Sequence, residues 1–133
     1  MQSHERFRRL LDRLQSPDDD IVCDLTPVHP DNLPIVVSAF QEERNAKRRA
    51  ALVRIVWESR EAEGVPLLGS ALADSADSVW KEALDGLVAI GGPEALQALR
   101  QARARLTTDA RDSNKREWID EAVDQINEQA PPA

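Results

Sequence analysis

Apolar residues recur at helical spacing through most of the chain, and no stretch sustains the alternation that is typical of a strand. Residues 4–15 predict a first helix, because Phe7, Leu10, Leu11 and Leu14 share one face. Similar apolar stripes predict six further helices: 32–42, 45–60, 65–73, 78–90, 93–106 and 114–129. The pattern therefore predicts an all-α protein of seven or eight helices.

The residues before position 31 are expected to form an N-terminal cap and a connector. Ser16-Pro17 interrupts the first helix, because proline disfavours helical geometry at the residue before it. Residues 17–25 predict a short helix, with an extended segment as the alternative. Cys23 follows two apolar residues there and is expected to be a small buried side chain. It is the single cysteine, so the chain cannot form an internal disulfide.

Capping residues set the expected ends of the later helices. Asp31 is the expected N-cap of the 32–42 helix. Gly91-Gly92 is expected to end the 78–90 helix, and Pro93 to begin the next one, because glycine favours helix C-termini and proline favours first turns.

One segment of the chain occurs nearly twice. Residues 45–58 and 77–92 carry the same small and apolar residues at an offset of 32, and 115–128 is a weaker copy. The matching positions are Ala51-Leu52 with Ile55-Val56, Ala83-Leu84 with Leu87-Val88, and Ala122-Val123 with Ile126. A repeat of this length indicates stacked helix pairs, which usually bind other molecules.

The formal net charge of −7 changes which partners are expected. It argues against general nucleic-acid binding and against an anionic membrane surface, since both require basic residues. It favours a basic partner, although negative charge also serves solubility alone. No apolar stretch reaches membrane-spanning length and the N-terminus lacks the apolar centre of a signal peptide, so a cytoplasmic location is expected.

Carboxylates form a strip on the last predicted helix. Glu117, Glu121, Asp124 and Glu128 follow one another at spacings of four, three and four residues, opposite the apolar side. This strip is either an interface for a basic partner or the solvated outer face of a terminal repeat.

The second helix of each pair supplies the other candidate partner-binding residues. Those expected to be exposed are Lys47, Arg54 and Glu58 in 45–60, and Lys81, Glu82 and Asp85 in 78–90. Trp57 lies at the edge of its apolar arc and is either an interface anchor or a core residue. Trp80 and Trp118 lie nearer the apolar arcs and are assigned to packing.

Enzymatic signals are weak in this sequence. His4 and His29 are far apart and lack the neighbours of a metal site. No nucleophile motif and no glycine-rich phosphate loop is present. We therefore expect no catalytic residues, no metal and no cofactor.

Three predicted helix pairs resemble HEAT-like repeats: 32–42 with 45–60, 65–73 with 78–90, and 93–106 with 114–129. The stretch from Val79 to Gly91 is similar to the second helix of many bacterial HEAT-like repeats, which place a small residue and leucine before a closing Ile-Gly. The third pair departs from this pattern, because Ala122 lies 39 residues after Ala83 and no Ile-Gly closes it.

The resemblance implies a single domain over 1–133, an α-α superhelix of about three helical hairpins. Residues 1–30 form the cap and connector, 31–129 the repeats, and 130–133 a frayed tail. The whole arrangement looks like small bacterial immunity proteins encoded beside polymorphic toxins. This resemblance would make the partner a basic toxin domain, bound through an acidic concave face lined by the second helices. The alternatives are a general adaptor that recognises a helix or a disordered segment, and a HEAT-like lyase or DNA-repair-type enzyme.

Overall fold

The computed structural model describes residues 2–129, with side chains for 4–110 and 112–129. Over residues 2–129 the chain forms eight α-helices and two short 3-10 turns and contains no strand, which confirms the all-α prediction. The predicted tail at 130–133 lies outside the described residues.

The helices follow the predicted segments closely. In chain order they are α1 (Gln2–Asp12), α2 (Ile21–Leu25), α3 (Leu33–Glu42), α4 (Ala46–Glu58), α5 (Val65–Ala71), α6 (Asp77–Ile90), α7 (Gly92–Arg105) and α8 (Ala110–Gln129). The 3-10 turns Pro30–Asn32 and Ala62–Gly64 precede α3 and α5. The largest boundary differences are at α8, which begins four residues early, and at α2, which is shorter than predicted.

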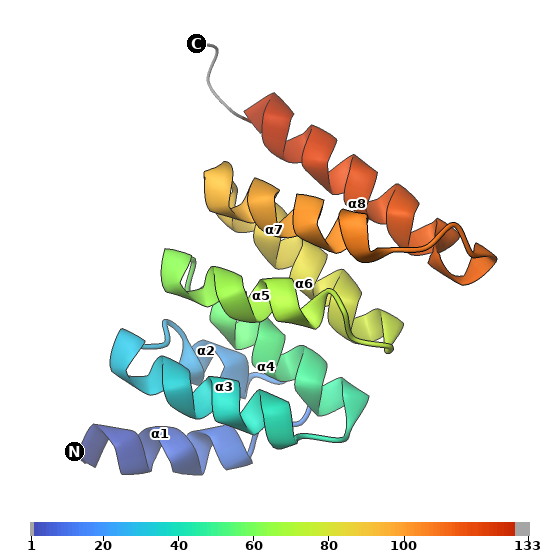
Figure 1. Cartoon of the computed structure of the whole chain (residues 1–133). Coiled ribbons are helices and arrows are strands. Elements are labelled where there is room, and N and C mark those ends of the chain that lie inside the picture. Colours follow the sequence, from blue (N-terminus) through green and yellow to red (C-terminus); the bar gives the residue numbers. More distant parts are fainter. Residues whose placement is uncertain (1, 130–133) are drawn as a thin grey trace.

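The helices stack in pairs as a repeat superhelix. Figure 1 shows α1, α3, α5 and α7 side by side from bottom to top, with α2, α4 and α6 behind them. α8 closes the stack and contacts both α6 and α7. We call α2, α4, α6 and α8 the second-helix layer. The predicted N-terminal cap is itself a helix pair, α1 with α2, at one end of the stack.

The repeated positions form the centre of the core. α4 and α6 make the most extensive helix contact in the described chain. Ala51, Leu52, Ala83, Leu84 and Leu87 are all fully or almost fully buried. Small residues alternate with larger aliphatic ones in this seam, so the two helices pack closely.

The segment before α2 differs from its prediction. Residues 16–20 form turns, and helix begins only at Ile21. The Asp19 carboxylate accepts hydrogen bonds from the Gln15 and Ser16 backbone N–H groups at 2.6 and 3.1 Å. Aspartate that bonds nearby backbone in this way favours a turn over a helix. The predicted helix over 17–25 is therefore confirmed only for its last turn.

Two further expectations about the N-terminal third are wrong. Asn32, not Asp31, occupies the N-cap position of α3, because the 3-10 turn before the helix includes Asp31. Cys23 is exposed rather than buried. α2 buries only Val22 and Leu25, so the position between them faces outward.

The glycine pair ends α6 as predicted. Gly91 and Gly92 have φ angles of 67° and 87°, in the left-handed region that glycine adopts without strain. The chain reverses there, and Pro93 lies in the first turn of α7.

Arg48 joins the first helix to the rest of the stack. Its guanidinium donates to the backbone carbonyls of Leu14 and Leu11, each at 2.9 Å, and pairs with Glu43 at 2.5 Å. The carbonyls at a helix C-terminus lack partners within their own helix. A side chain from α4 therefore completes the end of α1.

None of the helices in residues 2–129 combines the length and the apolar character that a membrane-spanning helix needs.

Candidate functional site

A close approach of α4 to α6 builds the middle of the second-helix layer. Trp57 of α4 lies directly against Gly86 of α6. A Cβ atom at Gly86 would be only 2.4 Å from Trp57 Cβ and 2.6 Å from its Cγ. Only a residue without a side chain fits there, so this glycine permits the indole to lie between the two helices.

Trp57 is held in place by charged neighbours. Its indole N–H donates to Glu82 Oε1 at 2.9 Å, and the Arg54 guanidinium carbon lies 4.9 Å from its ring centroid. Arg54 also pairs with Glu58 at 3.0 Å and with Glu82 at 3.4 Å. We call Arg54, Trp57, Glu58, Glu82 and Asp85 the central cluster.

The two carboxylates that α6 contributes to the central cluster have perturbed acidity. Burial raises the pKa of Glu82 above its ordinary value of 4.5, although the Trp57 hydrogen bond and the Arg54 charge act in the opposite direction. Burial also raises the pKa of Asp85, again against Arg54. Asp85 is exposed on the surface of α6, yet enough protein surrounds its carboxyl group to disfavour the charge. An additional positive charge near Glu82 and Asp85 would therefore stabilise their charged forms.

The acidity of Glu82 predicts a pH dependence of stability that the Glu82→Gln variant removes. Folding raises the pKa of Glu82, so the folded chain holds this proton in a pH window above 4.5 where the unfolded chain has lost it. The unfolding free energy of the wild-type chain, relative to the variant, is therefore expected to fall as pH rises through this window. Urea unfolding at a series of pH values between about 3 and 7 measures the difference.

Glu43→Gln is the matched control with the opposite sign. A backbone hydrogen bond from Asn45, followed by the bond from Arg48, lowers the pKa of Glu43 below 4.5. Its stabilising contribution is present above 4.5 and is lost as pH falls through the folded pKa. Parallel curves for the two variants would contradict the assignment of these shifts.

A second group of aromatic and basic side chains joins α6 to α8. The Trp80 and Trp118 rings meet edge to face, with centroids 6.1 Å apart and planes at 85°. Lys81 Nζ lies 4.8 Å from the Trp118 centroid and 5.6 Å from that of Trp80. Lys115 lies 5.3 Å from the Trp80 centroid. We call these four residues the tryptophan–lysine group.

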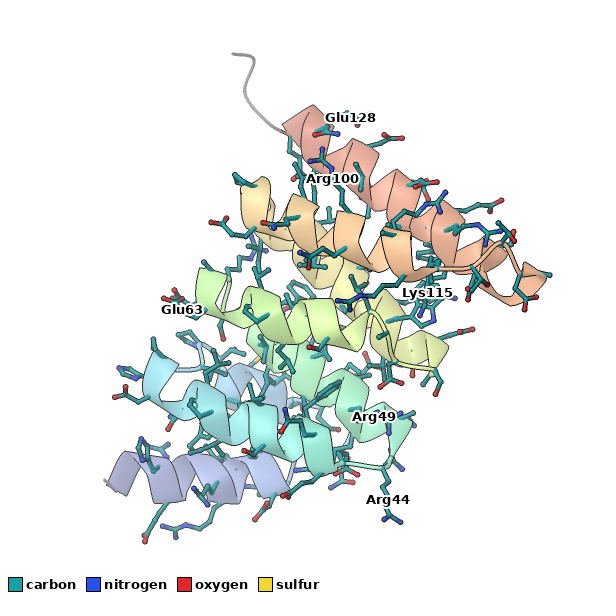
Figure 2. The ribbon with its side chains drawn as sticks, in the orientation of Figure 1. Arg44, Arg49, Glu63, Arg100, Lys115 and Glu128 are labelled. Atoms are coloured by element: carbon teal, nitrogen blue, oxygen red, sulfur yellow. The ribbon has the colours of Figure 1, made fainter. Side chains whose placement is uncertain are left out.

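Lys115 serves structure more than recognition. Its ammonium donates to the backbone carbonyls of Leu72 at 2.7 Å and Asp74 at 3.4 Å, and burial lowers its pKa. Figure 2 shows it reaching from α8 toward the loop between α5 and α6. A lysine in this position fastens the last helix pair to the pair before it.

The two tryptophans of this group differ in exposure. Trp80 is 3% exposed, as expected for packing. Trp118 packs against Trp80 as expected, but it is 39% exposed and is the one large hydrophobic side chain exposed among the residues with described side chains. Tryptophan is one of the residue types enriched in interface hot spots, so this exposed side chain is a candidate contact for a partner.

The structure brings some of the predicted site residues together and leaves others apart. Arg54, Trp57, Glu58, Glu82 and Asp85 meet in the central cluster. Lys81 belongs to the tryptophan–lysine group. Glu82 was expected to be exposed, but only 14% of its side chain is accessible, because it lies between Trp57 and Arg54.

Lys47 and the acidic strip lie outside both groups. Lys47 is exposed near the start of α4, two helical turns before Arg54. Glu117, Glu121, Asp124 and Glu128 are exposed on α8, opposite the buried Ile119, Ala122 and Ile126. The helical pattern thus predicted the orientation of the strip.

The part of the chain with described side chains contains no group of three or more His, Cys, Asp or Glu residues that could hold a metal ion. The central cluster offers ion pairs and three carboxylates, Glu58, Glu82 and Asp85. This arrangement suits recognition of a positively charged group.

The comparisons with known proteins agree with the architecture. A family model described as HEAT repeats matches residues 33–122, which spans α3 to the middle of α8. Neither a curated protein nor a solved structure matches the chain. Because the matched segment covers more than half of the sequence and coincides with the stacked helix pairs, the chain belongs to the HEAT-repeat family.

Proposed function

We propose that this protein is a non-catalytic module that binds another protein through its second-helix layer. HEAT repeats commonly mediate protein–protein binding, and this family membership gives the general function. One observation carries the choice of surface: Trp118 of α8 is exposed and lies beside Lys81 of α6. Lys81 directly precedes Glu82, which belongs to the central cluster on the same helix.

Trp118 replaces Trp57 as our candidate anchor. Trp57 already uses its N–H on Glu82, lies against Gly86 and has Arg54 over its ring. Its hydrogen-bond donor and one face of its ring are therefore already engaged within the chain. Trp118 presents accessible aromatic surface, and large aromatic side chains dominate the energetics of many interfaces.

The chemistry of the surface favours a basic partner. Burial disfavours the charged forms of Glu82 and Asp85. A lysine or arginine from a partner would stabilise these charges and so offset the cost of their burial. The net charge of −7 would speed the encounter with such a partner. The sharper form of the proposal is an immunity protein that neutralises a basic toxin, which rests on the resemblance to small bacterial HEAT-like proteins.

Affinity capture with the tagged full-length chain tests this proposal. A partner that uses the second-helix layer is expected to bind the wild-type chain and to bind the Trp118→Ser variant at least tenfold more weakly, as for a hot-spot residue. Gln97→Ser is the matched control, because Gln97 is exposed on α7 in the other layer. Equal loss in both variants, or none in either, would contradict the choice of surface.

Toxicity separates the two levels of the proposal. If the captured protein arrests growth when expressed alone, and co-expression of the wild-type chain but not of Trp118→Ser restores growth, the immunity function holds. A captured protein that is harmless by itself would overturn the immunity function and leave the binding module standing.

A further inference from the structure

Arginines gather on one side of α1, at the first end of the stack. α1 buries Phe7 and Leu11, whereas Arg6 and Arg9 are exposed and Arg13 is exposed in the closing turn. Because a helix turns about 100° per residue, spacings of three and four residues align these arginines. We call Arg6, Arg9 and Arg13 the arginine stripe.

The arginine stripe faces away from the rest of the stack. Arg8 and Asp12 line a groove together with residues of α3, which marks the side of α1 that faces its neighbour. Arg6 and Arg9 line a separate hollow with Leu10 and with Glu5, the one carboxylate among its lining residues. The stripe therefore lies on a side of α1 that does not face α3, and α1 is the lowest helix of the stack in Figure 1.

The acidic strip of α8 occupies the other end. Trp118 contacts Trp80 of α6 on one side of α8, and Asp120 pairs with Arg103 of α7 at 3.0 Å on the other. The strip, Glu117, Glu121, Asp124 and Glu128, lies on the remaining side, directed away from both neighbours. Figure 2 shows Glu128 on this last helix, at the opposite end of the stack from α1.

Neither set of charges is neutralised within the described residues. No described side chain forms an ion pair with any member of the arginine stripe or of the acidic strip. Charges between the helices behave differently: Arg49 pairs with Asp74 at 2.9 Å, and Arg103 with Asp120. Like charges at spacings of three and four residues repel, so each end bears a cost that an opposite charge would remove.

We propose that a second copy of this chain supplies that charge, with the arginine stripe of one copy lying along the acidic strip of the next. The two sets are complementary in sign and in spacing. At about 1.5 Å per residue they extend about 10 and 16 Å, so one stripe fits within one strip. The contact joins two different surfaces, so each added copy leaves a free end and the assembly grows head to tail.

The charges at the α7 end decide how the copies meet. Arg100 is exposed on α7 and lines a hollow with Ile126 and Gln129 of α8. Figure 2 shows Arg100 at the same end of the stack as Glu128. A second copy that simply continued both layers would place its α1 against α7, where Arg100 repels the arginine stripe. The docked α1 therefore lies along α8, and the second copy is displaced toward the second-helix layer.

Sedimentation velocity on the full-length chain tests the proposal. Exposed ion pairs are weak, so we expect a dissociation constant of about 0.1–1 mM at low salt. The weight-average mass should rise with concentration at about 20 mM salt and return to that of the monomer at about 300 mM salt, where charges are screened within about 6 Å. A wild-type chain that stays monomeric at about 1 mM and low salt overturns the proposal.

A charge-reversal variant separates this contact from general electrostatics. Glu121→Lys, Asp124→Lys and Glu128→Lys together change the net charge from −7 to −1, because each adds two positive charges. Weaker overall repulsion should promote association, yet the proposal predicts a monomer. Glu61→Lys, Glu63→Lys and Glu94→Lys reach the same net charge at exposed sites elsewhere and should associate at least as strongly as the wild type. Equal association of both variants overturns the proposal.

Mixing tests the head-to-tail order. A chain with Arg6→Gln, Arg9→Gln and Arg13→Gln keeps the acidic strip and carries no charge on the stripe, and the lysine variant of α8 keeps the arginine stripe. Each should be monomeric alone, and a mixture should form one-to-one dimers that do not grow. Growth beyond the dimer, or no association in the mixture, overturns the assignment of these two surfaces.

Discussion

Gly86→Ala is expected to lower the unfolding free energy by about 1–3 kcal/mol, as for other insertions into a packed core. The new methyl group would meet Cβ and Cγ of Trp57 at 2.4 and 2.6 Å. Trp57 cannot move aside freely, because Glu82 holds its N–H and Arg54 lies over its ring. α4 and α6 must separate instead. Alanine's better helix propensity recovers only about 1 kcal/mol.

Gly69→Ala is the matched control for this prediction. Gly69 also lies inside a helix, α5, but a Cβ there would be 3.5 Å from the Cβ of Ala98, an ordinary contact. Helix propensity then dominates, and we expect stability to rise by about 0.5–1 kcal/mol. Thermal and urea unfolding of both variants measures the contrast. A Gly86→Ala variant that is as stable as Gly69→Ala would show that the helix seam is looser than described.

Leu87→Ala is expected to cost about 2–5 kcal/mol, because Leu87 is fully buried and its truncation leaves a cavity. Leu87 lies on α6, at the middle of a stack in which each pair contacts mainly its neighbours. Stability in such arrays combines the stability of each repeat with the interfaces between repeats. Damage at the centre should therefore weaken the coupling between the two halves of the chain.

Ile126→Ala provides the comparison at the end of the stack. Ile126 is 2% exposed on α8, so its truncation removes a similar amount of buried surface. The loss should be confined to α7 and α8, since only one interface joins them to the rest. Hydrogen exchange should show faster exchange in α7 and α8 alone for Ile126→Ala, and in α4 and α6 together for Leu87→Ala. The same exchange pattern in both variants would contradict a stack of separable pairs.

The repeat architecture could be predicted from the sequence because its signal is local and occurs more than once. Ala51, Leu52, Ala83 and Leu84 follow helical spacing and are buried in the structure. The turn at Gly91-Gly92 was equally predictable, since its conformation requires glycine. Patterns of this kind depend only on residues within one or two helical turns.

The environment of single side chains at the site was harder to predict. Glu82 looked like an exposed carboxylate, but Trp57, 25 residues earlier, brings it a hydrogen bond and covers it. Trp118 lies near an apolar arc, but the helical pattern does not indicate that its edge-to-face contact with Trp80 leaves it 39% exposed. Cys23 sits in a single helical turn, where the neighbouring apolar residues do not indicate which side faces the core.

The Arg48 contact also orders events during synthesis. The carbonyls of Leu11 and Leu14 leave the ribosome 37 and 34 residues before the guanidinium that completes them. The first helix therefore lacks these two hydrogen bonds until the start of α4 has been translated. The docking of α1 therefore accompanies the packing of α3 against α4, so α1 is synthesised before the contact that completes its docking.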